Sequence, residues 1–427
     1  MKNKIRQKIS TKIEIDASKG FRFTTYEKKL KNCCNSKIKD ENYKSQGINK
    51  FNDNDMNKRQ NENNDENKII FNNTKYKLDK KKYLEENNII QIKNNENEND
   101  LYESSKQGFP NIGNTCYMNS FLQILIHIPF LISSLKKNKK KFEPDSSITN
   151  LIEIADEPTE KNLKLLKNKM GYKYNEYLSN DQEDSQEFGV KLINSLIDEE
   201  IKYKLFEKWE KPKYSNSSRN KDILNKKRDY LEEFLDKYID FQNETFIQKT
   251  FQFFESEMKL RKSRQIKEIN YIPEIDNQLS LELNYKDKND ILTLKELLIN
   301  KYYKSTRKLF KLPKIFMITL IRAVIGNNML NSSIIEFEDE LDLKEFMDKD
   351  FGDYKEITKF DLYAINISSG YSKNRGHYYS YIKIKDKWYC FNDSSCKEMD
   401  PYFQKKDENG IFYQSKEVYG LFYIRKT

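Results

Sequence analysis

Histidine and cysteine are both scarce in this sequence of 427 residues. It holds two histidines and five cysteines: His127, His377, Cys33, Cys34, Cys116, Cys390 and Cys396. The number of cysteines is odd and their spacing matches no disulfide framework, so a small secreted fold held by disulfides is not indicated. We therefore expect free thiols and a reducing location, in the cytoplasm, the nucleus or both.

Long apolar runs and a leader segment are also lacking. The first residues, Met-Lys-Asn-Lys-Ile-Arg, are not followed by an apolar stretch. No apolar run approaches the roughly 18 residues that a membrane span needs. We expect a soluble protein without a membrane partner.

A concentrated basic surface is lacking as well, although the formal net charge is +10. Residues 1–105 carry 23 Lys and Arg against 17 Asp and Glu, and the remainder carries 54 against 50. No basic stripe is interleaved with aromatic residues, so we expect no nucleic-acid partner. The lysine-rich run 136–141 fits a solvated loop between helices better than a localisation signal.

Residues 1–105 differ in composition from the rest of the chain. They are rich in Asn and Lys and contain polar tracts at 61–67 and 94–100. Such tracts bury too little apolar surface to offset the entropy of ordering. The segment is predicted to be mostly disordered, with short strands near 68–71 and 88–92, and residues 106–427 are predicted to form one catalytic domain.

The pattern of residues 106–427 predicts helices first and strands later. Apolar spacing predicts helices over 116–128 and 184–197, the first closed by Pro129, with further helical segments to about residue 238. Strands are predicted over 279–283, 315–320, 360–367, 378–384, 388–392 and 418–424. This order indicates an α+β fold with an antiparallel sheet.

Cys116 is the first candidate for chemistry. It lies where a loop containing Gly108, Pro110 and Gly113 runs into a predicted helix. The positive end of a helix dipole favours the thiolate, which is the nucleophilic form of cysteine. An isolated cysteine is more often a buried core residue, but a loop with this composition is not typical of a core.

A catalytic cysteine usually requires a histidine as its base. His127 lies eleven residues along the same helix, roughly 16 Å from Cys116 along the axis at the helical rise, and cannot reach it. Its apolar neighbours indicate a packed histidine. If the chain is a Cys/His enzyme, His377 is therefore the base.

A third catalytic residue follows from a predicted hairpin with a two-residue turn at 385–386. In that register Asn392 is a diagonal neighbour of His377, within reach of a polar side chain. An amide or carboxylate there could hold the imidazole in one tautomer. A register slip of one residue would present Asp393 instead, so both are candidates for the orienting residue.

These segments together resemble the ubiquitin-specific protease family. Residues 108–123, Gly-Phe-Pro-Asn-Ile-Gly-Asn-Thr-Cys-Tyr-Met-Asn-Ser-Phe-Leu-Gln, resemble its Cys box. Residues 376–381, Gly-His-Tyr-Tyr-Ser-Tyr, and 388–393, Trp-Tyr-Cys-Phe-Asn-Asp, resemble its His box. Residues 181–188, Asp-Gln-Glu-Asp-Ser-Gln-Glu-Phe, resemble its Gln/Asp box. The segments occur in family order over about three quarters of the chain.

The resemblance implies a fold and an activity. The fold would be a papain-like core with thumb, palm and fingers that grips ubiquitin, with its C-terminal tail between Cys116 and His377. The activity would be thiol-dependent hydrolysis of the isopeptide or peptide bond after the last glycine of ubiquitin. The third catalytic position of the family falls on Asn392, and its oxyanion-stabilising position falls on Asn111.

The Gln/Asp box implies contacts with the ubiquitin tail from Gln182, Asp184 and Glu187. That tail is rich in arginine, so acidic partners are physically reasonable. The alternative is that these residues are only a solvated helix start with acids in its first turn.

One departure from the family concerns the fingers, where many members bind zinc through two Cys-x-x-Cys pairs. Residues 251–263 resemble the first pair, with Leu260 and Ser263 where cysteines would stand. No cysteine occurs between Cys116 and Cys390, so a thiolate zinc site is excluded there. We expect no metal, no cofactor and fingers held by packing alone.

Two other functions are compatible with these motifs. The chain could be a catalytically weak or inactive ubiquitin-binding scaffold, or it could act on another ubiquitin-like modifier. The expected partners are ubiquitin and ubiquitinated proteins, and the sequence does not determine the oligomeric state.

Overall fold

The computed structural model describes residues 106–201, 245–262, 267–283, 291–303, 305–323, 330–348, 357–372, 375–408 and 410–426, together with two short strands near the N-terminus. The chain divides into two compact units, 1–97 and 98–427. In the first unit, β1 (Lys12–Ile15) and β2 (Phe21–Thr24) form an antiparallel pair. Most of the segment 1–105, including the strands predicted near 68–71 and 88–92, lies outside the described residues.

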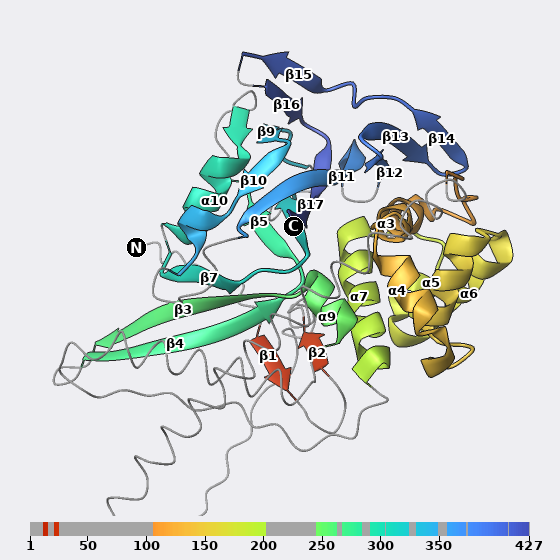
Figure 1. Cartoon of the computed structure of the whole chain (residues 1–427), viewed down its shortest axis with the longest axis horizontal. Helices are drawn as coiled ribbons and strands as arrows, with labels where there is room; N and C mark the ends of the chain where they lie inside the picture. Colours follow the sequence, from red (N-terminus) through yellow and green to blue (C-terminus); the bar gives the residue numbers. More distant parts are fainter. Residues whose placement is uncertain are drawn as a thin grey trace, which may run out of the picture. The chain divides into compact units, whose positions relative to one another are not determined.

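The second unit begins with helices that gather on one side of it (Figure 1). They are α3 (Cys116–Ile126), α4 (Leu131–Lys137), α5 (Ser147–Asp156), α6 (Glu160–Lys173) and α7 (Ser185–Ile201), with short 3-10 turns η1 (Lys139–Lys141) and η2 (Asn175–Leu178). The prediction of a loop over the lysine-rich run 136–141 is wrong in part, because Lys136 and Lys137 belong to α4. The lysines of η1 are exposed, as expected.

An eight-stranded sheet forms the other half of the second unit. Its strands run in the order β14 (Ser395–Glu398), β13 (Lys387–Asn392), β12 (Arg375–Ile384), β11 (Lys359–Ser372), β17 (Val418–Arg425), β8 (Ile315–Ile321) and β5 (Leu279–Glu282), with β10 (Glu340–Asp342) paired to β11. All its pairs are antiparallel except β5 with β8.

Two smaller sheets complete the fold. One contains β15 (Gln404–Asp407), β16 (Gly410–Ser415), β9 (Ile334–Glu338) and β6 (Ile291–Thr293). The other contains β4 (Lys267–Asp276), β3 (Phe253–Lys262) and β7 (Arg307–Lys311), with β3 and β4 forming a long hairpin. The remaining elements among the described residues are α9 (Phe246–Phe251), α10 (Leu294–Tyr302) and η3 (Lys344–Phe346).

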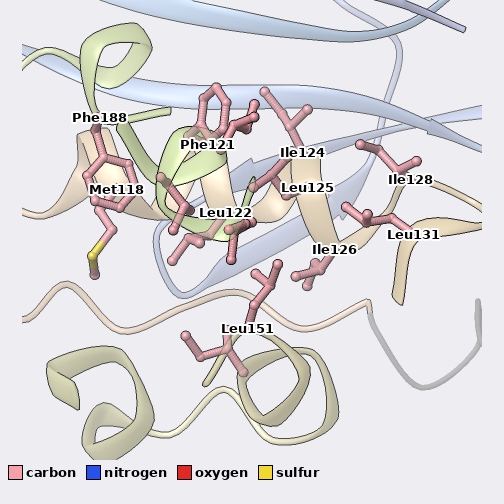
Figure 2. Close-up of a cluster of buried hydrophobic side chains, with 14 of the residues drawn as sticks. Met118, Phe121, Leu122, Ile124, Leu125, Ile126, Ile128, Leu131, Leu151 and Phe188 are labelled. Carbon is pink, nitrogen blue, oxygen red and sulfur yellow. The ribbon is translucent and has the colours of Figure 1, made fainter. Parts of the chain in front are cut away.

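Helix α3 lies at the centre of one hydrophobic core. All eleven of its residues are buried, and its apolar side chains meet Leu151 of α5 and Phe188 of α7 (Figure 2). The helix ends at Ile126, two residues before Ile128, where Pro129 disfavours helical backbone. Burial on every side fixes the position of its first residue, Cys116.

Two consecutive glutamates at the end of α7 hold the helical half together. The Glu199 carboxylate accepts hydrogen bonds from the backbone N–H groups of Ser147 and Ile148 at the start of α5. The Glu200 carboxylate does the same for Phe246 and Ile247 at the start of α9. Each carboxylate satisfies helix N–H groups that have no partner inside the helix and lies at the positive end of the helix dipole.

The predicted α+β fold is confirmed, and most predicted elements differ from the observed ones only at their ends. The helix predicted over 184–197 spans Ser185–Ile201, and the strand predicted over 360–367 spans Lys359–Ser372. The helical segments predicted between 202 and 238 lie outside the described residues. Among the described residues no single helix meets the criteria for a membrane span, and only α3 with α4, bent by 75° between them, meets them as a pair.

Candidate functional site

The loop that leads into α3 is folded around the side chain of Asn111. Its Oδ1 accepts hydrogen bonds from the backbone N–H groups of Gly113 and Thr115, at 3.2 and 3.1 Å. Gly113 and Asn114 have φ of 110° and 50°, a turn that favours glycine at its first position. The turn delivers Cys116 to the first position of α3, where its side chain is 4% exposed.

His377 is carried on β12, beside the strand that carries Asn392. The turn has the predicted two residues, since Ile384 pairs with Lys387 and Ser380 pairs with Phe391. His377 Nε2 lies 2.6 Å from Asn392 Oδ1. An amide oxygen can only accept, so Nε2 carries the proton and Nδ1 is the nitrogen available to the thiol.

The Cys116 side chain is close enough to His377 to raise the pKa of the imidazole, so the helical half and the sheet meet at these two residues. The interaction with Cys116 is the main reason that the pKa of His377 is raised to about 9. Burial acts in the opposite direction, while the bond with Asn392 and the negative charge of Asp393 also raise the pKa. The environment therefore favours the protonated imidazole, as an ion pair with a thiolate requires.

The carboxylate of Asp393 contacts two asparagines from the segment around Cys116. Its Oδ2 accepts from Asn111 Nδ2 at 3.0 Å, and its Oδ1 accepts from Asn119 Nδ2 at 2.8 Å. Its backbone oxygen accepts from Phe109 N at 2.7 Å. The approach is so close that a Cβ on Gly108 would lie 2.2 Å from the carbonyl carbon of Ser394, so only glycine fits there.

His127 is a packed histidine, as predicted. It is 2% exposed, its Nδ1 lies 2.8 Å from the backbone oxygen of Gln123, and its ring packs against Phe391 with an interplanar angle of 46°.

Gln182 faces the strand that carries the histidine. Its Nε2 donates to the Gly376 carbonyl at 2.6 Å and its Oε1 accepts from the Gly376 N–H at 3.2 Å. Its loop is held from the opposite side by Asn114, whose Nδ2 donates to the Asn180 carbonyl at 2.8 Å. The loop thus connects the segment before Cys116 to the residue before His377.

Asp184 and Glu187 both have partners within the chain. Asp184 Oδ1 accepts from the backbone N–H groups of Gln186 and Glu187, and Oδ2 accepts from the Tyr419 hydroxyl. Burial raises the pKa of Asp184, and these hydrogen bonds partly oppose that rise. Asp184 therefore has the geometry of a helix cap. Its burial distinguishes it from the solvated helix start that the sequence left open as the alternative.

Glu187 forms an ion pair with Lys191, one turn later on α7, and Lys191 also pairs with Glu176. Burial alone would lower the pKa of Lys191, but the hydrogen bonds that it donates to Glu176 and Glu187 raise it. The neighbouring Glu183 is partly buried, and desolvation and the other acids raise its pKa. Glu176, Glu183 and Glu187 thus form an acidic cluster around the ammonium group of Lys191.

Two residues of the site, Asn119 and Lys191, were missed by sequence reasoning. Asn119 lies three residues after Cys116, on the same face of α3. Lys191 lies four residues after Glu187, which is ion-pair spacing on a helix. Spacing could have indicated both, but the contact of Asn119 with Asp393 spans 274 positions of the chain.

The base of the long β3–β4 hairpin is held by charge as well as by packing. Arg307 on β7 pairs with Glu255 and Glu257 on β3 and with Glu274 on β4, and the Tyr302 hydroxyl donates to Glu255 at 3.1 Å. The expectation of packing alone is therefore wrong for this part of the hairpin. Among the described residues, no cluster of His, Cys, Asp and Glu could hold a metal ion.

The comparisons with known proteins agree on one family. The family model described as ubiquitin carboxyl-terminal hydrolase matches residues 107–423. Ubiquitin carboxyl-terminal hydrolase 32 of Mus musculus and of Homo sapiens are each 41% identical over 70 residues, 16% of this chain and 4% of theirs. Ubiquitin carboxyl-terminal hydrolase 25 of Arabidopsis thaliana is 36% identical over 85 residues, 19% of this chain and 12% of its own. The matched segments thus span only a small part of these relatives.

Solved structures show the same fold. The SAGA DUB module Ubp8/Sgf11/Sus1/Sgf73 bound to monoubiquitin matches with a TM-score of 0.55 and 18% identity, over 76% of this chain and 70% of that one. The module bound to ubiquitin aldehyde matches with a TM-score of 0.53 and 20% identity, over 76% and 71%.

Proposed function

This chain belongs to the ubiquitin carboxyl-terminal hydrolase family, and we propose that it is a thiol-dependent deubiquitinase that cuts the isopeptide or peptide bond after the last glycine of ubiquitin. The observation that carries the proposal is the arrangement of Cys116, His377 and Asn392: Cys116 raises the pKa of His377, and His377 Nε2 lies 2.6 Å from Asn392 Oδ1. It supplies a nucleophile, a base and a group that orients the base.

The proposed reaction proceeds in two acyl transfers. His377 takes the thiol proton at Nδ1, and the Cys116 thiolate attacks the carbonyl carbon of the last ubiquitin glycine. The imidazolium then gives its proton to the leaving amine, and a thioester remains on Cys116. Water attacks the thioester with His377 again acting as base, which releases ubiquitin with a free carboxylate.

Asn111 is the proposed donor to the tetrahedral oxyanion. One N–H of its Nδ2 donates to Asp393, and the other remains for the oxygen that becomes negative during attack. Three hydrogen bonds to its Oδ1 fix the amide in advance, at 3.1 to 3.3 Å. A donor held in place before the reaction loses no orientation energy in the transition state.

The acids around the start of α7 are the proposed site for the arginine-rich ubiquitin tail. Glu183 and Glu187 are the carboxylates most open to it, because Asp184 is engaged with Tyr419 and the helix start. Gln182 would contact the tail only by exchanging its bonds with Gly376. A reducing compartment, cytoplasm or nucleus, suits a reaction that requires a free thiol.

A ubiquitin probe with a C-terminal electrophile tests this function. We expect the probe to label Cys116 in the wild-type chain and not in Cys116→Ala, which should still bind ubiquitin. Cys390→Ala and Cys396→Ala should retain labelling, because neither thiol has a histidine partner among the described contacts and burial raises the pKa of both. Binding without labelling would indicate the inactive scaffold, and labelling only by the probe of another modifier would indicate a different substrate.

A further inference from the structure

Asn119 is a buried residue that contacts Asp393 and lies on the same helix as Cys116. It is 2% exposed and lies one helical turn after Cys116 on α3. Its Nδ2 is within hydrogen-bonding distance of three acceptors, Asp393 Oδ1 at 2.8 Å and the backbone oxygens of Pro110 and Phe109 at 3.2 and 3.5 Å. The Asn119 side chain therefore contacts both segments that meet at the site, the loop before Cys116 and the residue that follows β13.

The orientation of this amide follows from the charges around it. A carboxylate and two carbonyl oxygens surround one end, so that end must be the NH₂ group, because the amide oxygen would be repelled by all three. The oxygen of Asn119 is buried and has no hydrogen-bond partner. An unpaired buried carbonyl costs free energy, and an alanine or leucine would avoid that cost.

Asn119 is connected to Asn111 in two ways. The first is covalent, since Pro110 immediately precedes Asn111 and its carbonyl is one of the three acceptors. The second passes through Asp393, whose two carboxylate oxygens accept separately from Asn119 and Asn111. The Phe109 N–H closes the arrangement by donating to the Asp393 backbone oxygen.

We propose that Asn119 is a positioning residue for the reaction, which fixes the Asp393 carboxylate and through it the Asn111 amide that meets the oxyanion. This inference rests on the proposed deubiquitinase activity and adds a residue to it. Asn119 itself is too deeply buried to touch a substrate. Its effect should therefore appear in the chemical step and not in ubiquitin binding.

The helix offers a matched control one turn further on. Gln123 is 1% exposed, its Nε2 donates to the Gln107 carbonyl at 2.9 Å, and its oxygen also has no partner. It shares the burial and the unpaired oxygen of Asn119 but has no bond with Asp393 among the described contacts. Gln123→Ala therefore reports what the loss of a buried amide from α3 does to stability alone.

The experiment first establishes that the full-length wild-type chain cleaves a fluorogenic ubiquitin C-terminal amide; no cleavage would refute the proposed function itself. Asn119→Ala should then lower kcat by about ten- to a hundredfold with KM within threefold, because an oxyanion donor loses its alignment. Its affinity for ubiquitin aldehyde, which forms a tetrahedral adduct, should fall more than its affinity for ubiquitin. Gln123→Ala should keep kcat within threefold.

A reciprocal exchange separates positioning from folding. Asn119→Asp sets two carboxylates against each other and should lower kcat further than Asn119→Ala. Adding Asp393→Asn lets the new amide donate to position 119 and accept from Asn111, so kcat should recover at least fivefold from the single Asn119→Asp value. An active wild type with an Asn119→Ala kcat within threefold, an effect confined to KM, or a double variant no better than the single one would each overturn the inference. If Asn119→Ala does not fold, the comparison of kcat between the double variant and the single Asn119→Asp variant tests the inference by itself.

Discussion

The side-chain amide of Gln182 hydrogen-bonds both backbone groups of Gly376, the residue before His377. A neighbouring antiparallel strand would exchange the same pair of bonds with a residue at that position. Gln182 thus holds the start of the histidine segment against the loop that precedes α7.

Replacing Gln182 by leucine should lower kcat/KM about tenfold, since leucine keeps the bulk but loses both bonds. Steady-state cleavage of the ubiquitin amide measures this. Gln404→Leu on β15 provides the control and should leave kcat/KM unchanged. A Gln182→Leu value within twofold of wild type would mean that the bridge has no part in the reaction.

The pH profile should follow the proton on His377. Its pKa is raised to about 9, so the imidazole keeps its proton below that pH and loses it above. The leaving amine needs this proton, and kcat/KM should therefore fall as the pH rises through about 9. Asp393→Asn removes a charge that raises the pKa and should move this alkaline limb to lower pH.

The control for that shift is Asp386→Asn, which removes a carboxylate from the turn at the other end of the same hairpin. Its alkaline limb should match that of the wild type. A limb that stays in place in Asp393→Asn would contradict the assignment of the titrating group to His377.

Substitutions of Asn392 and of Asp393 should lower kcat for different reasons. Asn392→Asp should stay active because it keeps an acceptor for His377 Nε2. Asn392→Ala should lose roughly one to three orders of magnitude in kcat, less than His377→Ala, because it only orients the base. Asp393→Ala should lower kcat through Asn111 instead.

Ubiquitin aldehyde separates the two residues. If the aldehyde binds Asp393→Ala as tightly as it binds the wild type, Asp393 does not act on the oxyanion. A loss in Asp393→Ala far greater than that in Asn392→Ala would make Asp393 the more important of the two.

The fingers should depend on Arg307 and not on zinc. Removing Arg307 leaves the buried Glu255 carboxylate without its cation, so Arg307→Met should lower the free energy of unfolding by on the order of 3 kcal/mol. Urea unfolding measures the change, with Lys359→Met, which removes an exposed pair with Glu340, as the control expected to change little. Chelators should alter neither the unfolding curve nor the rate, and stoichiometric zinc in the purified protein would contradict this.

Residues 1–105 should be dispensable for cleavage of a minimal ubiquitin substrate. The family model begins at residue 107, and the first described side chain of the second unit, Lys106, donates to the Tyr389 hydroxyl at 3.0 Å. A variant that begins at Ser105 should keep kcat/KM within threefold of the full chain. If it folds but loses most of its rate, the N-terminal segment takes part in catalysis.

Local rules were enough to predict much of this site from the sequence. Glycines and a helix start identified the loop before Cys116, and helical rise excluded His127. A two-residue turn placed Asn392 beside His377, because strand pairing leaves few registers once the turn length is set. The order of the predicted elements, helices first and strands later, indicated the fold class, because that order is typical of an α+β fold.

Only the tertiary structure decided what the charged and amide side chains contact. Asp393 bonds with Asn119 across 274 positions, and Gln182 bonds with Gly376 across 194. Asp184 has the geometry of a cap, and Arg307 gathers carboxylates from two strands. A sequence lists donors and acceptors but not their distances, and hydrogen bonds act only over about 3 Å. The partners of these residues are therefore fixed by how the helical half packs on the sheet.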